Sequence, residues 1–150
     1  MFKNLYKQYK NIGIKKITVS ANIDTGCYAW AAYGFSASQE DADKLIRYVD
    51  SAASRGRAYQ VQQKGSDGVK RMVSYTPTRE DVSNMKRVLE SYYANPINTG
   101  KTIPVRMLTA VAKSACQAVW PAERASWSGS LDLTKQSERA YFENYINFND

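Results

Sequence analysis

Apolar residues near the start of the chain recur first at helical spacing and then at every second position. The helical spacing covers residues 2–12 and predicts a helix whose opposite face carries lysines. The alternating pattern covers residues 17–23 and predicts a strand with one buried and one polar face. Gly13 is expected to end the helix, and Asp24-Thr25-Gly26 is expected to end the strand.

Two further helices are predicted on either side of a hairpin. Ser38 and Thr78 each precede an aspartate by three positions, which is the spacing of a helix N-cap. Gly56 is expected to end the first of these helices, and Asn95-Pro96 the second. Between them, residues 57–75 alternate around an Asp67-Gly68 turn, as expected for two antiparallel strands. The apolar stripes of the two helices are Ala42, Leu45, Ile46, Val49, Val82, Met85, Leu89 and Tyr92.

The last third of the chain predicts a long helix, a short strand or turn, and a final helix. Pro104 suits the first turn of the long helix, which extends to Trp120-Pro121. Residues 127–133 predict the strand or turn, and Thr134 is expected to cap the final helix. The buried stripe of the long helix is Val105, Leu108, Val111, Ala112, Ala115 and Val119. The whole pattern predicts one α+β domain over residues 1–150, with about five helices on a small, mainly antiparallel sheet.

The charge balance points to an anionic partner. The chain of 150 residues has a formal charge of +7 and eleven tyrosines. The residues around the hairpin are strongly basic, and we predict that Arg57, Lys70 and Arg71 bind a nucleotide, a nucleic acid or an acidic protein surface. Tyr59 and Tyr75 are predicted to stack on bases. The alternative is that these charges are a solvated face that contributes only solubility.

Several chemistries are excluded by the residues that are present. The chain has no histidine and only two cysteines, so a structural zinc site, a histidine general base and Ser-His-Asp catalysis are excluded. No nucleotide-binding glycine motif occurs, and nothing in the spacing of Asp24, Asp132 and Glu138 requires them to meet. Cys116 lies in an apolar run and is expected to be buried. We expect no metal, no signal peptide, no membrane partner and a cytoplasmic location, and the oligomeric state stays open.

The stretch ANIDTGCYAWAAYGF, residues 21–35, combines a strand end with polar and aromatic residues. Such a corner can present polar side chains and backbone N–H groups to a ligand, so we predict Asp24, Thr25, Gly26 and Tyr28 as ligand-binding residues. In the alternative interpretation, the aromatic rings at Tyr28, Trp30 and Phe35 simply pack beneath the sheet.

Residues 9–35 resemble the later part of GNAT-type acyltransferases. The helix exit at Ile12-Gly13-Ile14, the strand at Ile17-Thr18-Val19 and the ending Tyr33-Gly34-Phe35 carry this resemblance. The family's pyrophosphate-binding loop has no counterpart here, and Trp30 stands where the tyrosine general acid of the family often lies. Residues 9–35 and 127–133 also resemble a domain of large bacteriophage proteins that accompany injected DNA.

The resemblance to phage proteins implies a small intracellular accessory or anti-host-defence protein, located in the host cytoplasm, that binds an anionic partner without a cofactor. The resemblance to acyltransferases implies a GNAT-like scaffold. The alternative function is therefore a GNAT-like acyltransferase that uses acetyl-CoA at a nonstandard site in residues 22–35. Whether the protein is an enzyme stays open in the sequence.

Overall fold

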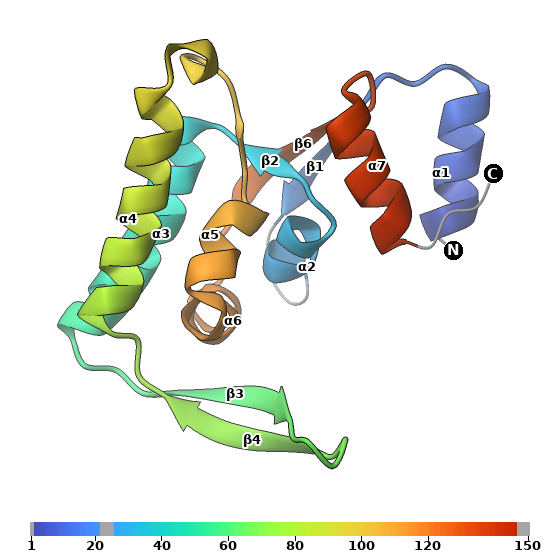
Figure 1. The fold of residues 1–150 in the computed structure, drawn as a ribbon. Helices are drawn as coiled ribbons and strands as arrows, with labels where there is room; N and C mark the ends of the chain where they lie inside the picture. Colours follow the sequence, from blue (N-terminus) through green and yellow to red (C-terminus); the bar gives the residue numbers. More distant parts are fainter. Residues whose placement is uncertain (1, 22–25, 147–150) are drawn as a thin grey trace.

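The computed structural model describes residues 2–21 and 26–146, which form the predicted α+β fold (Figure 1). The described residues contain seven α-helices, where the sequence predicted about five. The elements are, in order, α1 (Phe2–Asn11), β1 (Lys16–Ala21), α2 (Gly26–Ala32), β2 (Ser36–Ala37), α3 (Gln39–Ser54), β3 (Tyr59–Lys64), β4 (Lys70–Tyr75), α4 (Arg79–Ala94), the 3-10 turn η1 (Pro96–Asn98), β5 (Ile103–Pro104), α5 (Arg106–Val111), α6 (Lys113–Ala122), β6 (Trp127–Asp132) and α7 (Gln136–Tyr145).

The main sheet has the strand order β1-β6-β2-β5, and every neighbouring pair is antiparallel. Strand β6, predicted only as a short strand or turn, lies inside the sheet and pairs with β1 along its whole length. Its side chains alternate as a half-buried strand requires, with Trp127 and Leu131 in the core and Ser128 on the exposed face. A side chain at Gly129 would meet the Trp127 ring at 2.7 Å, so the indole covers this glycine.

Helices surround the sheet and bury the predicted apolar stripes. Figure 1 shows α3 and α4 side by side, with α2, α5 and α6 in the middle of the molecule and α7 beside α1. Trp120 is fully buried, and its indole N–H donates to the Leu45 carbonyl oxygen at 3.1 Å. The rings of Tyr6 and Phe142 join α1 to α7, with 4.9 Å between their centroids. The fully buried or nearly buried stripe residues of α3 and α4 are Ala42, Leu45, Ile46, Val49, Val82, Met85 and Leu89.

The prediction of one long helix through residues 105–119 is wrong. The helix breaks at Ala112, where φ is −151° and ψ is 47°, and continues as the separate helix α6. Pro104 lies in strand β5 and not in a first helical turn. On α5, before the break, Leu108 is fully buried, whereas Val111, predicted in the same buried stripe, is 38% exposed. No glycine or proline stands at the break, which is why the local sequence did not reveal it.

The sequence predicted that Thr134 caps the last helix, and this prediction is wrong. The N-cap position of α7 is Lys135, which makes no capping hydrogen bond with its side chain. The Thr134 hydroxyl and backbone N–H both donate to one carboxylate oxygen of Asp132, at 2.5 and 3.0 Å. These bonds lower the pKa of Asp132, because they stabilise its charged form. The Thr134 hydroxyl therefore bonds to the Asp132 carboxylate and not to a backbone N–H at the start of α7.

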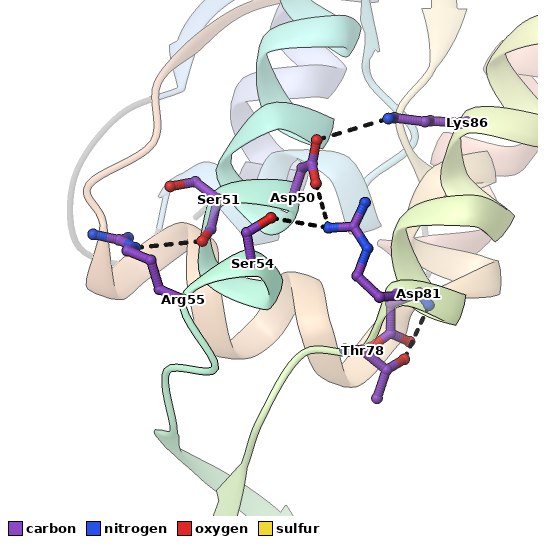
Figure 2. Close-up of polar contacts among 8 residues, drawn as sticks. Asp50, Ser51, Ser54, Arg55, Thr78, Asp81 and Lys86 are labelled. Atoms are coloured by element: carbon purple, nitrogen blue, oxygen red, sulfur yellow. Dashed lines mark hydrogen bonds and ion pairs between the residues drawn. The ribbon is translucent and has the colours of Figure 1, made fainter.

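A cluster of polar contacts ties the end of α3 to the start of α4 (Figure 2). The Arg79 guanidinium donates to Asp50 at 2.6 Å and to the Ser54 hydroxyl oxygen at 3.1 Å, and the Lys86 ammonium lies 3.7 Å from Asp50. At the start of α4, the predicted cap at Thr78 is confirmed as a reciprocal capping box with Asp81. The hairpin β3–β4 connects these two helices, so the cluster fixes both of its ends.

Asp50→Asn is expected to remove a small stabilising contribution that is present at neutral pH and lost in acid. The hydrogen bond from Arg79 lowers the pKa of Asp50 more than burial raises it. Such a carboxylate stabilises the fold at pH values above its unfolded pKa of about 3.9. This contribution disappears as the pH falls through the lower pKa of the folded state. Because Arg79 is 60% exposed, we expect a loss of only about 0.5–1 kcal/mol at neutral pH.

Denaturant unfolding of wild type and Asp50→Asn across the acid range measures this effect. The two free energies of unfolding should converge as the pH falls below the folded pKa of Asp50. Asp43→Asn is the matched control, because its ion pair with Arg47 on the same helix is more exposed, at 56% for the aspartate. A difference between wild type and Asp50→Asn that does not shrink in acid would contradict the assigned role.

Candidate anion-binding site

The predicted hairpin is confirmed. Arg71 of β4, one of the predicted anion-binding arginines, bonds to its turn. Strands β3 and β4 pair from Tyr59–Tyr75 to Lys64–Lys70, and Gly68 in the turn has a φ of +80°. The Asp67 carboxylate accepts the Val69 N–H and a bidentate pair of bonds from Arg71, at 3.2 and 2.7 Å. The bonds from Arg71 lower the pKa of Asp67. Arg71 therefore serves the turn and has its charge compensated there.

Arg57, the second predicted arginine, is compensated by Glu123 from the end of α6. The Arg57 guanidinium lies 2.6 Å from a Glu123 carboxylate oxygen, and Arg55 lies 3.6 Å from the same oxygen. The Tyr59 hydroxyl donates to that oxygen as well, at 2.6 Å. This cluster fastens the base of the hairpin to α6. An anionic ligand at Arg57 would have to compete with Glu123.

The prediction that Tyr59 and Tyr75 stack on bases does not agree with the structure, because neither ring is presented to solvent as a platform. Tyr59 is 4% exposed, and its ring packs in the core behind the hairpin. Tyr75 is its cross-strand partner and is half-buried, with its hydroxyl donating to Asp81. Burial is the main cause that raises the pKa of both phenols. These rings anchor the hairpin to the body of the protein.

Three lysines converge on a hollow between the hairpin and the start of α6. Lys64 and Lys70 are directly opposite each other in the strand register, and Lys113 lies across from them on α6. All three side chains are exposed, and among the described residues none forms an ion pair. The hollow has a volume of about 410 Å³, and its other lining residues are neutral: Gln62, Gln63, Ser114 and Gln117.

This lysine hollow has the electrostatics of an anion site. Like charges placed directly opposite on two strands destabilise the pair, and no carboxylate lines the hollow to offset them. A bound phosphate or carboxylate would relieve this repulsion. The amide groups of the glutamines and the Ser114 hydroxyl can donate further hydrogen bonds to such an anion. Of the three predicted anion-binding residues, only Lys70 belongs to this hollow.

Tyr28 lies near the lysine hollow. It is half-buried on α2, and burial is the main cause that raises the pKa of its hydroxyl. The nearby Cys116 thiol and Tyr145 hydroxyl act in the same direction, whereas the neighbouring Gln117 side chain, which also lines the hollow, acts to lower this pKa. Tyr28, one of the predicted ligand-binding residues, is therefore separated from the lysine hollow only by Gln117.

The rest of the predicted ligand corner is only partly described. Asp24 and Thr25 lie outside the described residues, and Gly26 is the first residue of α2. Trp30 packs against Phe35 and Tyr33, with ring centroids 5.1 and 5.6 Å apart. Phe35 is fully buried, and Trp30 and Tyr28 are partly buried against the core. The packing of Trp30 and Phe35 agrees with the alternative interpretation.

The described part of the chain also bears on the expectations for paired carboxylates, metal ligands, membrane spans and Cys116. Asp132 and Glu138 are neighbours, since the Asp132 N–H donates to Glu138 at 3.3 Å, but Glu138 is also paired with Lys135. Residues 2–21 and 26–146 contain no group of three or more acidic, cysteine or histidine side chains that could hold a metal ion. No helix in these ranges has the length and apolar character needed to cross a membrane. The predicted burial of Cys116 is confirmed.

Comparisons with protein-family models, curated proteins and solved structures give no significant match to this chain.

Proposed function

We propose that the protein acts by binding a phosphate-bearing anion, a nucleotide or a nucleic acid, in the lysine hollow. The observation that carries this proposal is the convergence of Lys64, Lys70 and Lys113 without a compensating carboxylate. Phosphate groups neutralise such clusters and release counterions, which gives affinity without reading of sequence. The overall charge of +7 assists the approach of an anion from a distance.

The lining of the hollow favours recognition of phosphate over recognition of bases. Its side chains are lysines, glutamines and a serine, and none is aromatic. Stacking platforms, which give base contacts to single-stranded nucleic acids, are therefore not part of the lining. We expect little discrimination between sequences and a strong dependence of affinity on salt.

Replacing Lys64, Lys70 and Lys113 together with glutamine is expected to weaken binding of a labelled oligonucleotide at least tenfold. Three phosphate contacts would be lost, so the slope of log affinity against log salt should fall by about 2–3. Fluorescence anisotropy over a salt series measures both quantities, with single-stranded DNA, double-stranded DNA and ATP as separate probes. The melting temperature should stay near that of wild type, because all three side chains are exposed.

The matched control is the triple change of Lys7, Lys15 and Lys16 to glutamine, which removes the same charge from another exposed surface. It should leave affinity nearly unchanged. Equal losses in both triple variants would mean that net charge alone drives binding, and the hollow would then not be a site. Changing Arg57 and Arg71 to glutamine should matter less than changing the lysines, since Glu123 and Asp67 already compensate these arginines.

The phage-type accessory role, including action against host defence in the host cytoplasm, rests on the resemblance of residues 9–35 and 127–133. Affinity purification from host cells tests it. The acyltransferase alternative also rests on resemblance, and mass spectrometry after incubation with acetyl-CoA and host lysate tests it. New acetyl groups on a defined target would overturn a function that consists of binding alone.

A further inference from the structure

A second, smaller pocket lies where the start of α5 meets α7. Its volume is about 200 Å³, and Tyr92, Pro104, Arg106 and Tyr141 form much of its wall. It shares no lining residue with the lysine hollow. Two tyrosine rings and a proline form flat parts of this wall, and Lys135, Ser137 and Glu138 make the rest of it polar.

Arg106 is held in this pocket by a ring and not by a carboxylate. Its guanidinium carbon lies 4.2 Å from the centroid of the Tyr141 ring, the geometry of a cation–π contact. Among the described residues, Arg106 forms no ion pair. Stacking occupies the face of the guanidinium but leaves the N–H groups at its edge able to bind an anion through two parallel hydrogen bonds.

The ring beneath Arg106 is fixed from two sides. The Tyr141 hydroxyl donates to the Ala32 carbonyl oxygen at 3.3 Å. Gly34 lies against the ring so closely that a side chain there would come within 2.6 Å of a ring carbon. The platform for the guanidinium is therefore preorganised, which reduces the entropy lost when a ligand binds.

The remaining charges of the pocket leave the arginine uncompensated. Lys135 and Glu138 pair with each other at 3.5 Å, and Glu138 also accepts the Asp132 N–H. Tyr92 directs its hydroxyl to the Thr102 carbonyl oxygen at 2.7 Å, so its ring serves as a wall. The pocket thus carries one positive charge in excess, on Arg106, beside the flat rings of Tyr92 and Tyr141 and the paired charges of Lys135 and Glu138.

We propose that this pocket binds a small organic monocarboxylate with a flat or short apolar body. The planar Arg106 fork matches the geometry of a carboxylate. The rings of Tyr92 and Tyr141 match the apolar part of such a molecule, and the volume admits only a small one. This ligand site goes beyond the phosphate-binding function proposed for the lysine hollow and is independent of it.

Titration of the full chain with benzoate tests the proposal, with amide chemical shifts followed by NMR. Saturable shifts are expected at Gly34 and around Tyr141. Arg106→Gln should weaken benzoate at least tenfold, and Arg106→Lys should weaken it several-fold, because lysine keeps the charge but not the planar fork. Arg139→Gln is the control, since Arg139 is an exposed arginine on the same helix as Tyr141, and it should bind as wild type does.

The other arms separate the proposal from its rivals. Acetate should bind more weakly than benzoate at the same residues, whereas phosphate that binds as well as benzoate would overturn the assignment to carboxylates. No saturable shift with benzoate, or equal losses in Arg106→Gln and Arg139→Gln, would overturn the site itself. The triple lysine variant of the hollow should bind benzoate unchanged, so failure of one proposal is distinguishable from failure of the other.

Discussion

Leu108→Ala is expected to lower the free energy of unfolding by about 3 kcal/mol. Leu108 lies on α5 with no exposed surface, so the change removes buried methyl groups and leaves a cavity in the close-packed core. The surrounding helices cannot fully collapse onto this space, because each is held by its own contacts. Denaturant unfolding monitored by circular dichroism gives the free energy directly.

Val111→Ala is the matched control for burial, because Leu108 and Val111 lie on the same helix α5 but differ in exposure. The sequence predicted both as members of one buried stripe, in which their losses would be comparable. In the structure Val111 is 38% exposed, and its replacement is expected to cost less than about 1 kcal/mol. Comparable large losses in both variants would contradict the exposure of Val111. Losses below about 0.5 kcal/mol in both would mean that Leu108 is not in the core.

Gly34→Ala is expected to lower the free energy of unfolding by about 3 kcal/mol, through two separate terms. The backbone at Gly34 has a φ of +100°, which costs a residue with a side chain roughly 1–2 kcal/mol. The new methyl group would also lie 2.6 Å from a Tyr141 ring carbon, so the ring or the backbone must move at a cost of about 1–3 kcal/mol. Thermal and denaturant unfolding of the variant measure the sum.

Gly13→Ala and Gly100→Ala separate the two terms. Both glycines have positive φ, at +77° and +74°, but a side chain at either would meet nothing within 4 Å. Their replacement should therefore show the conformational cost alone, about 1–2 kcal/mol. If Gly34→Ala costs no more than these controls, the Tyr141 ring yields freely and is not the fixed platform described above.

The elements that could be predicted from sequence are those set by local chemistry. The helix caps at Ser38 and Thr78 form as expected, because a hydroxyl and an N–H three residues away suffice to define them. The hairpin follows from alternation around Asp67-Gly68, since its strands are neighbours along the chain. The buried faces of α3 and α4 follow from the spacing of apolar residues.

The lysine hollow could be predicted only in part, because it depends on contacts between distant segments. The hairpin register alone would have placed Lys64 opposite Lys70. Nothing local indicates that Lys113 joins them, or that Glu123 reaches Arg57 from 66 positions along the chain. Their charge alone therefore favours Arg57 and Arg71 in the sequence, although in the folded protein Glu123 and Asp67 pair with them. The break at Ala112 is a similar case, since packing and not local sequence decides it.

The pairing of the first strand with the last has a consequence for the order of folding. Ile17 of β1 lies opposite Leu131 of β6, so this ladder closes a loop of more than a hundred residues. By contrast, α3, the hairpin and α4 are consecutive along the chain, and contacts between them form at low entropic cost. During synthesis this middle segment can assemble early, whereas β1 must wait for β6 to emerge from the ribosome. Until then β1 has exposed edges on both sides, and this interval is when the nascent chain is most open to mispairing.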